Sequence, residues 1–341
     1  MLVPDYQRLQ GLQGGLELRE NALWVPRGIG SGCRLSVDRT RAVPNADKLA
    51  QTKLYVVPVG NRGDWIEAWN GRDFVPARVP YDPDVNNQRD VTFLDLGMPQ
   101  IANAATYDVF GKFNWGSGRW DLRAVKWNST TARWASAPAL PYIHADGLAM
   151  HRGVFVAPQG TAYASASPRP APEWRFLGTI YASAAGQIED SAAKRLVWNS
   201  DNRVARTMRV IESADSWAYS TASFRAANNN TANALDFVRG LDEDAVEARV
   251  QYGENSTLTC NFIAGVGLDS TTVNSGDSGW QQITTAAIIA YVTARWIGLP
   301  GLGRHVLTWL ERGHGSGTQT MYGDNADPTI LQSGIFATVM A

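Results

Sequence analysis

The sequence is poor in cysteine, lysine and histidine, and it has no long apolar run. Of its 341 residues only Cys33 and Cys260 are cysteines, too few for a disulfide framework. The most apolar segment, residues 286–296, contains Arg295 and is much shorter than the ~20 apolar residues needed to cross a membrane. The N-terminus lacks a basic region followed by an apolar stretch, so no signal peptide is predicted. We therefore expect a protein that is made in a reducing cytoplasm and does not insert into membranes.

The chain also lacks an excess of charge of either sign. It carries 31 Lys and Arg residues against 32 Asp and Glu residues, a formal net charge of −1. Such a balance provides no overall field toward nucleic acid or an anionic membrane, so no nucleic-acid partner is expected. Nearly all of the positive charge is arginine, whose planar guanidinium group suits contacts with other proteins.

Residue spacings typical of metal sites and phosphate loops are missing. A glycine-rich segment, residues 28–33, lacks the following Lys-Ser/Thr of a phosphate loop and runs into a predicted strand, so we interpret it as a turn. No histidine pair has metal-ligand spacing, so structural or exposed roles are expected for each. The histidines are His144, His151, His305 and His314.

Nucleophile and calcium motifs are incomplete as well. The glycines around Ser31 and Ser278 do not form a G-x-S-x-G nucleophile elbow. The acidic cluster 242–244 lacks EF-hand spacing and is interpreted as a solvated turn. A pair of carboxylates for glycoside cleavage would leave no sequence signature, so that possibility stays open. The sequence predicts no catalytic residue, no cofactor-binding residue, no metal ligand and no cofactor, and hence a protein that is not an enzyme.

Aromatic residues and period-two patterns dominate what is present. In residues 246–252, Val246, Ala248, Val250 and Tyr252 alternate with polar residues, which is the signature of a half-buried strand. The 13 tryptophans have two interpretations: they fill β-sandwich cores, or they form exposed platforms for sugars or partner chains. Similar alternation recurs at 107–113, 120–127, 174–181, 204–211, 217–224 and 257–263.

Two details of these strands are specific expectations. Arg206 and Arg209 fall on opposite faces of the strand at 204–211, as in a strand that is wetted on both sides or lies at an interface. Cys260 lies between Leu258 and Phe262 on one predicted strand face, where we expect a buried free thiol.

Helical periodicity is scarce. The best candidate is residues 45–54, with Asn45 as N-cap and apolar Ala46, Leu49 and Ala50 on one stripe. Residues 188–198 fit one or two helical turns and, equally well, a strand at 194–198. Many short strands separated by turn pairs predict an all-β fold of two antiparallel β-sandwich or jelly-roll-like domains with a short N-terminal lead segment.

A segment rich in Pro, Ala and Ser, residues 157–172, is typical of an extended linker or a long loop. We therefore divide the chain into an anchor or assembly segment (1–50), an N-terminal β domain ending in this linker (51–172) and a C-terminal β-sandwich domain (173–341). Gly, Asn and Ser gather at 226–233 and 313–320, which we expect to be loops that carry recognition on a rigid scaffold.

A series of short strings lies in order along residues 53–341. The most specific of them is residues 189–199, followed by Asn202-Arg203-Val204. The other strings are residues 53–62 with 69–71, 107–110, 122–127 with 130–133, 146–156, 176–180, 265–271, 303–311, 322–324 and 332–335. Taken in this order, the strings resemble tail-fibre and virion structural proteins of tailed bacteriophages.

The resemblance implies a place in a particle rather than an activity. It implies a fibre (tail or head), a spike or a capsid decoration protein, located on the virion, that forms a homo-oligomer, with a homotrimer expected by analogy. Other virion proteins would bind the N-terminal segment, where residues 16–25 are apolar enough to add a strand to a partner's sheet. A glycan or protein of the host surface would be contacted during attachment. The alternatives are a polysaccharide-degrading enzyme of β-architecture and a cellular lectin-like carbohydrate-binding module.

Overall fold

The computed structural model consists almost entirely of β-strands. It describes residues 31–60, 64–71, 74–80, 92–96, 101–132, 174–283, 288–327 and 332–341, and the backbone of short strands at 17–19, 22–24, 141–143, 149–151, 154–155 and 163–164. The described part holds one short 3₁₀ helix, η3 (Ala227–Asn229). No helix in these ranges is long and apolar enough to cross a membrane. The prediction of an all-β fold is confirmed.

The chain forms two compact units that are interleaved in sequence. Unit 1 comprises residues 1–189 and 197–203, and unit 2 comprises residues 190–196 and 204–341. The linker expected at 157–172 lies outside the described residues, apart from the strand at 163–164. The boundary near residue 172 therefore stays a prediction.

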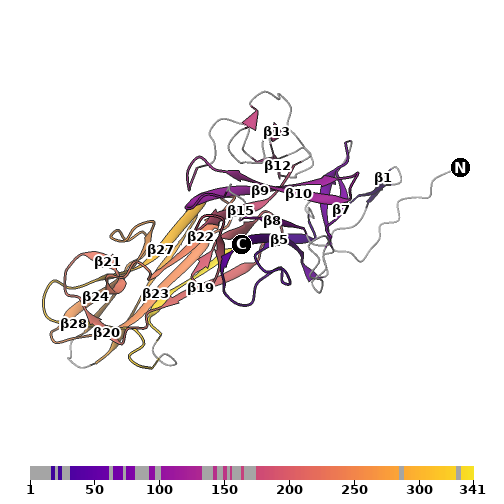
Figure 1. Cartoon of the computed structure of the whole chain (residues 1–341). Coiled ribbons are helices and arrows are strands. Elements are labelled where there is room, and N and C mark those ends of the chain that lie inside the picture. The colour runs from indigo at the N-terminus through magenta and orange to yellow at the C-terminus, as the bar shows by residue number, and fades with distance from the viewer. Residues whose placement is uncertain are drawn as a thin grey trace. The chain divides into compact units, whose positions relative to one another are not determined.

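Unit 1 contains several antiparallel sheets (Figure 1). The largest has the order β10-β9-β15-β12-β11, with β18 also paired to β15, and smaller sheets are β3-β5-β8, β6-β7, β1-β2 and β13-β14. The strands are β1 (Glu17–Arg19), β2 (Ala22–Trp24), β3 (Cys33–Ser36), β4 (Lys48–Gln51), β5 (Lys53–Pro58), β6 (Trp65–Trp69), β7 (Phe74–Arg78), β8 (Phe93–Asp95), β9 (Ala105–Asn114), β10 (Arg119–Lys126), β11 (Pro141–Ile143), β12 (Ala149–His151), β13 (Val154–Phe155), β14 (Tyr163–Ala164), β15 (Arg175–Ala182) and β18 (Val197–Asn199).

Strand β15 is the central strand of unit 1. All eight of its residues are buried, because its two edges pair with β9 and β18 and both of its faces are covered. Its alternation therefore does not separate a wet face from a dry one, in contrast to what the pattern at 174–181 predicted. The core around it includes Leu35, Leu54 and Val109, each 2% exposed or less.

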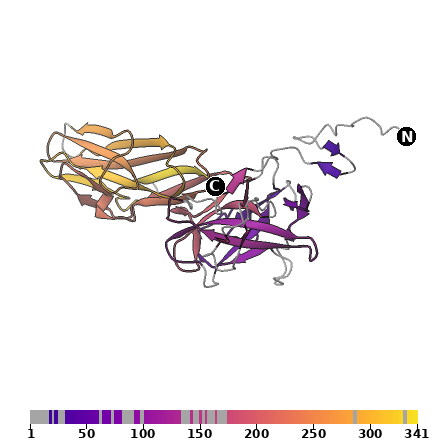
Figure 2. The same cartoon turned by 90° about the horizontal axis from the view of Figure 1, so that it is seen from above.

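Unit 2 is a β-sandwich whose strands run lengthwise through it (Figures 1 and 2). One sheet has the order β25-β24-β27-β22-β17-β16, with β21 paired to β27; the other has β19-β29-β23-β28-β20, with β26 paired to β23. All of these pairs are antiparallel except the parallel pair of β17 and β22. The strands are β16 (Ile188–Asp190), which joins the two units, β17 (Lys194–Arg195), β19 (Ala205–Ile211), β20 (Ser216–Ala218), β21 (Phe224–Ala226), β22 (Ala234–Arg239), β23 (Val246–Ser256), β24 (Cys260–Leu268), β25 (Gly279–Ile283), β26 (Ala290–Gly298), β27 (Gly303–Arg312), β28 (Gln319–Tyr322) and β29 (Gly334–Met340).

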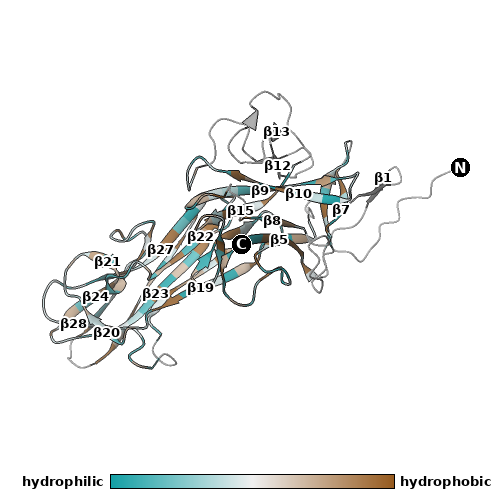
Figure 3. Ribbon diagram, viewed as in Figure 1, coloured by the Kyte–Doolittle hydropathy of each residue, from teal (hydrophilic) through white to brown (hydrophobic). Residues whose placement is uncertain are grey.

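The core of unit 2 lies between these two sheets. The alternation at 246–252 is confirmed, since Val246, Ala248, Val250 and Tyr252 are at most 1% exposed while their neighbours on β23 face outward. Brown and teal residues alternate along β22, β23 and β27 in Figure 3, as expected for strands with one dry and one wet face. Trp309 on β27 packs against Tyr252 across the core, with ring centroids 5.5 Å apart.

Two expectations of helix are corrected. Residues 45–54 form no helix: β4 and the start of β5 occupy this range, with Ala50 in the left-handed region at φ 49°. The apolar stripe was misleading because Leu49 is 59% exposed. Residues 188–198 take the strand alternative, as β16, β17 and β18.

The expectation for strand 204–211 is half right. Arg209 is exposed, but Arg206 is 6% exposed and faces the interior of unit 2. There its guanidinium group donates to both oxygens of Asp190, at 3.1 and 3.3 Å. Asp190 also accepts from Arg195 at 2.7 Å. The strand is therefore wetted on one face, and the second face carries a buried ion pair.

Candidate functional site

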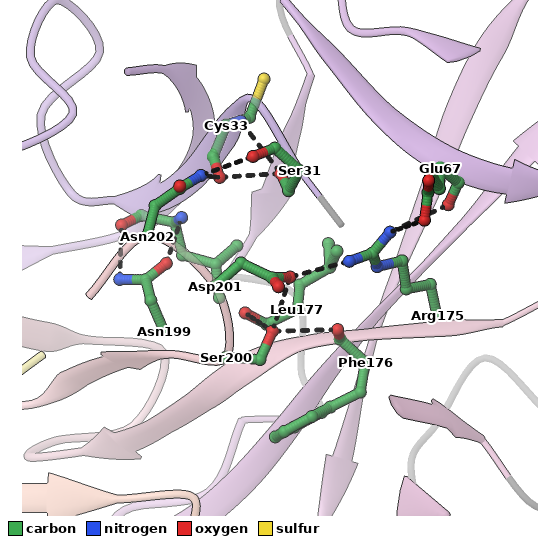
Figure 4. A network of polar contacts seen from close by, with 11 residues as sticks. Ser31, Cys33, Glu67, Arg175, Phe176, Leu177, Asn199, Ser200, Asp201 and Asn202 are labelled. Carbon is green, nitrogen blue, oxygen red and sulfur yellow. Dashed lines mark hydrogen bonds and ion pairs between the residues drawn. The ribbon is translucent and has the colours of Figure 1, made fainter. Parts of the chain in front are cut away.

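Two asparagines hold strand β3 of unit 1 in place through side-chain hydrogen bonds (Figure 4). The Asn199 amide copies a strand pairing: its Oδ1 accepts from the backbone N of Leu35 at 2.6 Å, and its Nδ2 donates to the Leu35 carbonyl at 3.2 Å. Asn202, in the left-handed region at φ 55°, donates from Nδ2 to the carbonyls of Ser31 and Cys33 at 2.8 and 3.0 Å. We call these two side chains the asparagine clamp.

A second group of polar side chains adjoins the clamp. Arg175, whose side chain is 3% exposed, donates to Asp201 at 2.9 Å and lies 3.7 Å from a Glu67 carboxylate oxygen. The Ser200 hydroxyl lies within 3.1 Å of the Phe176 and Leu177 carbonyl oxygens. Asn199, Asn202, Phe176 and Leu177 belong to the strings at 176–180, 189–199 and 202–204 singled out in the sequence. These four residues therefore make buried structural contacts.

The space beside the clamp is too small for a substrate. The cavity there has a volume of about 10 Å³, enough for roughly one water molecule. Burial raises the pKa of the Cys33 thiol to about 12, with a smaller contribution from Asp64, so this thiol is not a nucleophile at neutral pH. The cavity is lined by Ser31, Cys33, Arg34, Leu35, Val56, Ile66, Leu177 and Asp201.

Unit 2 contains two fully buried carboxyl groups that the sequence did not reveal. Glu311 on β27 accepts hydrogen bonds from Trp217 Nε1 at 2.6 Å, Arg225 Nε at 2.7 Å and the Asn228 backbone N at 3.2 Å. Burial raises the pKa of Glu311 despite these donors. Glu254 on β23 has no hydrogen-bond partner on either oxygen among the described residues.

Glu254 is kept protonated by its surroundings. Burial raises its pKa to about 10, with further contributions from Cys260 and Glu311. Both glutamates are 0% exposed, so the pair has no surface that a polysaccharide could reach in this structure. Glycoside cleavage requires carboxyl groups that flank a bound sugar, and these two do not meet that requirement.

The residues singled out in the sequence are scattered. His305 is 4% exposed and bonded to Asp269 at 2.8 Å, and His314 is exposed. His144 and the side chain of His151 lie outside the described part. In the described ranges, no three His, Cys, Asp or Glu side chains are grouped as metal ligands.

The other sequence candidates have structural contacts or lie in the solvent. The Ser31 hydroxyl is bonded to the backbone of Cys33, in a local turn. Ser278 is exposed. Asp242 pairs with the buried Arg239 at 3.0 Å, so the acidic turn is held by an ion pair. Cys260 is a free thiol with 1% exposure, as expected, but Leu258 does not share its strand face: β24 begins at Cys260, and Leu258 precedes it with 54% exposure.

Large apolar side chains in the described part of the chain are exposed mainly in one stretch of unit 2. Of the eleven with substantial exposure, eight lie in residues 258–299, on and around β25 and β26. Trp280 on β25 is 68% exposed, more than any of the others. Single exposed apolar residues are ordinary, whereas a contiguous apolar patch marks an interaction surface. Strands β25 and β26, which carry Trp280, Tyr291 and Ile297, lie side by side. The eight are Leu258, Val273, Trp280, Ile288, Ile289, Tyr291, Ile297 and Leu299.

Comparisons with known proteins add little. No protein-family model and no curated protein matches the chain. Among solved structures, the insecticidal delta-endotoxin Cry8Ea1 from Bacillus thuringiensis is similar over 91% of this chain and 51% of its own, at 8% identity and a TM-score of 0.26. A beta-porphyranase of glycoside hydrolase family 86 from the human gut bacterium Bacteroides plebeius is similar over 70% of this chain and 30% of its own, at 9% identity and a TM-score of 0.22. The chain thus spans about half or less of these proteins, and likenesses this low support no conclusion about function.

Proposed function

We propose that this chain is a structural component of a phage-like virion, a fibre, spike or decoration protein, which assembles as a homo-oligomer. The observation that carries the proposal is the concentration of exposed apolar side chains at 258–299, with Trp280 68% exposed. Burying such side chains against a second copy removes apolar area from water, at ~25 cal/mol per Å². The strings at 176–180, 189–199 and 202–204, which resemble virion proteins, support the same proposal. The residues of the asparagine clamp that they contain make buried structural contacts and do not line an accessible site.

The oligomer is tested by light scattering at micromolar concentration. We expect a mass of three times the 37.2 kDa of one chain. Replacing Trp280 with Ser should shift the mass toward that of the monomer. Trp115→Ser is the matched control, since Trp115 is 45% exposed, lies in unit 1 and donates its Nε1 to the Trp69 carbonyl. A monomer mass for the unaltered protein, or equal dissociation by both substitutions, contradicts the proposal.

Place in a particle is tested by antibody-gold electron microscopy and mass spectrometry of purified particles. Deleting residues 1–30 should prevent incorporation if this segment is the anchor. The deletion stops before β3, because Leu35 on this strand is 2% exposed and hydrogen-bonded to Asn199. A longer deletion that reached residue 40 would remove β3 and destroy unit 1. Absence of the full chain from the particles contradicts the virion proposal. Release of reducing sugar from host polysaccharide by purified protein would favour the enzyme instead.

A further inference from the structure

The outward face of the second sheet of unit 2 carries a row of three arginines and a phenylalanine. Strand registers place Arg209 opposite Phe336, Phe336 opposite Arg249, and Arg249 opposite Arg295, across β19, β29, β23 and β26. The three arginines are exposed and Phe336 is half-buried. We call these four residues the arginine row.

The charge of the row is only partly balanced. Arg295 pairs with Glu247 at 2.8 Å. Arg209 and Arg249 form no ion pair with any described residue, and the Arg249 guanidinium carbon lies 5.5 Å from the Phe336 ring centroid. Like charges directly opposite in a sheet, as at Arg249 and Arg295, are destabilising. The contact with Phe336 stabilises Arg249, but neither Arg249 nor Arg209 has a carboxylate of the described residues as a partner.

Hydroxyl and amide groups surround the row. On one side of the row, two residues along the strands, Thr207 lies opposite Thr338. On the other side, also two residues away, Gln251 lies opposite Thr293. Aromatic rings stack on sugar rings, and hydroxyl and amide side chains form hydrogen bonds with sugar hydroxyl groups. The face therefore combines cation, aromatic and hydroxyl groups within one flat surface.

We propose that the arginine row binds an acidic polysaccharide, with Arg209 and Arg249 holding carboxylates of sugar units that are ~10 Å apart, two strand spacings. Guanidinium groups bind carboxylates in bidentate geometry, which fixes the orientation of the bound chain. Phe336 lies between the two cations and provides the stacking surface for the sugar rings. This inference deepens the proposed function by naming a ligand class for the outward face, and it rests on that function for the role of the ligand in attachment.

Two other occupants fit the face less well. A second copy that presents the same row would set arginine against arginine, and Lys is absent from unit 2 beyond Lys194. A net charge of −1 provides no field toward nucleic acid, and the row has only two unpaired cations to neutralise a phosphate backbone. An acidic sugar chain needs few charges and many hydroxyl contacts, which is what this face provides.

Isothermal titration calorimetry of the full chain with polygalacturonate tests the inference. We expect saturable binding that weakens as salt rises from 50 to 500 mM, because the contacts are exposed and screened. Neutral dextran should not bind. Arg209→Ala and Arg249→Ala should each weaken binding about tenfold, as expected for a charge-assisted hydrogen bond. Arg312→Ala is the matched control, since Arg312 is a half-buried arginine on β27 of the opposite sheet, and it should bind as the unaltered chain does.

Both row substitutions are at exposed positions, and unchanged circular dichroism and light-scattering mass will show that fold and assembly persist. No binding of polygalacturonate, equal loss with Arg312→Ala, or tighter binding of single-stranded DNA at the same row would overturn the inference. Particle incorporation is measured on the same variants. If the chain enters particles yet fails to bind polygalacturonate, this inference falls and the virion proposal stands. If the chain binds polygalacturonate and is missing from particles, the virion proposal falls and the sugar site stands.

Discussion

Asn199 pairs with Leu35, a residue 164 positions earlier in the sequence, through both ends of its side-chain amide. The amide takes the place that a neighbouring strand would occupy, and it satisfies a buried N–H and a buried carbonyl at once. A buried backbone group left without a partner costs ~1–3 kcal/mol. The contact therefore stabilises unit 1 at a point where β3 would otherwise have unpaired backbone.

Asn199→Ala should accordingly lower the free energy of unfolding by ~2–4 kcal/mol, since two buried backbone groups lose their partner. Chemical denaturation followed by tryptophan fluorescence measures the change. Asn128→Ala is the control: Asn128 is exposed in unit 1 and has no side-chain hydrogen bond among the described residues, so its replacement should cost less than ~0.5 kcal/mol. Equal effects from the two substitutions would show that the clamp contributes nothing.

Gly178 is required by the close packing of β15 against β18. A Cβ at this position would lie 2.2 Å from the Trp198 carbonyl oxygen and 2.9 Å from Leu35 Cδ1. Gly178→Ala should destabilise unit 1 by ~1–3 kcal/mol or more, because a backbone atom has to move. Gly116→Ala provides the comparison, since its nearest contact is an Asn114 side-chain oxygen at 3.4 Å. Thermal unfolding of the two variants side by side decides the matter, and a Gly178→Ala protein as stable as Gly116→Ala would refute the packing argument.

Glu254 should make the protein less stable as pH rises. Its pKa is raised from 4.5 to about 10, so between these values the folded state holds a proton that the unfolded state has lost. Stability from this group is complete below pH 4.5 and falls with increasing pH until about pH 10, at up to ~1.4 kcal/mol per pH unit. Glu254→Gln removes the titrating proton and should flatten this decline.

Denaturant unfolding of both proteins at pH 5 and pH 8.5 tests this expectation. The stability advantage of Glu254→Gln over the unaltered chain should be larger at the higher pH. Glu247→Gln, at an exposed position on the same strand, is the control and should leave the pH dependence unchanged. A parallel pH dependence for the unaltered chain and Glu254→Gln would mean that Glu254 is ionised in the folded state.

The two thiols should be inert while the protein is folded. Cys33 and Cys260 are 2% and 1% exposed, and the pKa of Cys33 is about 12, so little thiolate forms at neutral pH. Ellman's reagent should label neither residue in buffer and both in guanidinium chloride. Rapid labelling without denaturant would show that one of the thiols is accessible after all.

The sequence predicts the strands of this protein better than the contacts between them. Period-two alternation identified β23 and its inward residues, because the interior of a sandwich selects apolar side chains at every second position. The same rule failed for Arg206, whose burial depends on Asp190 on another strand. It failed at 45–54, where Leu49 faces solvent and the apolar stripe has no core to pack against.

The clamp and the arginine row were beyond reach for a different reason. Each is defined by strand register, which joins residues that are far apart in the chain, such as Arg209 and Phe336. Arg249 was predicted as an outward residue of its strand, but nothing in the sequence placed Arg295 beside it. Glu254 could have been suspected, since it follows Tyr252 with the same inward period.

The interleaving of the two units limits how the chain can be divided. A fragment that begins near residue 172 retains all of unit 2, yet it also carries β15 without its partner β9. In this fragment, the edge of β15 that pairs with β9 would have no partner, and the apolar side chains of the strand, including Phe176, Ile180 and Tyr181, would lose their cover. Open apolar edges recruit other chains. Insolubility of such a fragment would then report the orphaned strand, while a fragment that begins at residue 190 and omits β15 would reveal the intrinsic solubility of the sandwich.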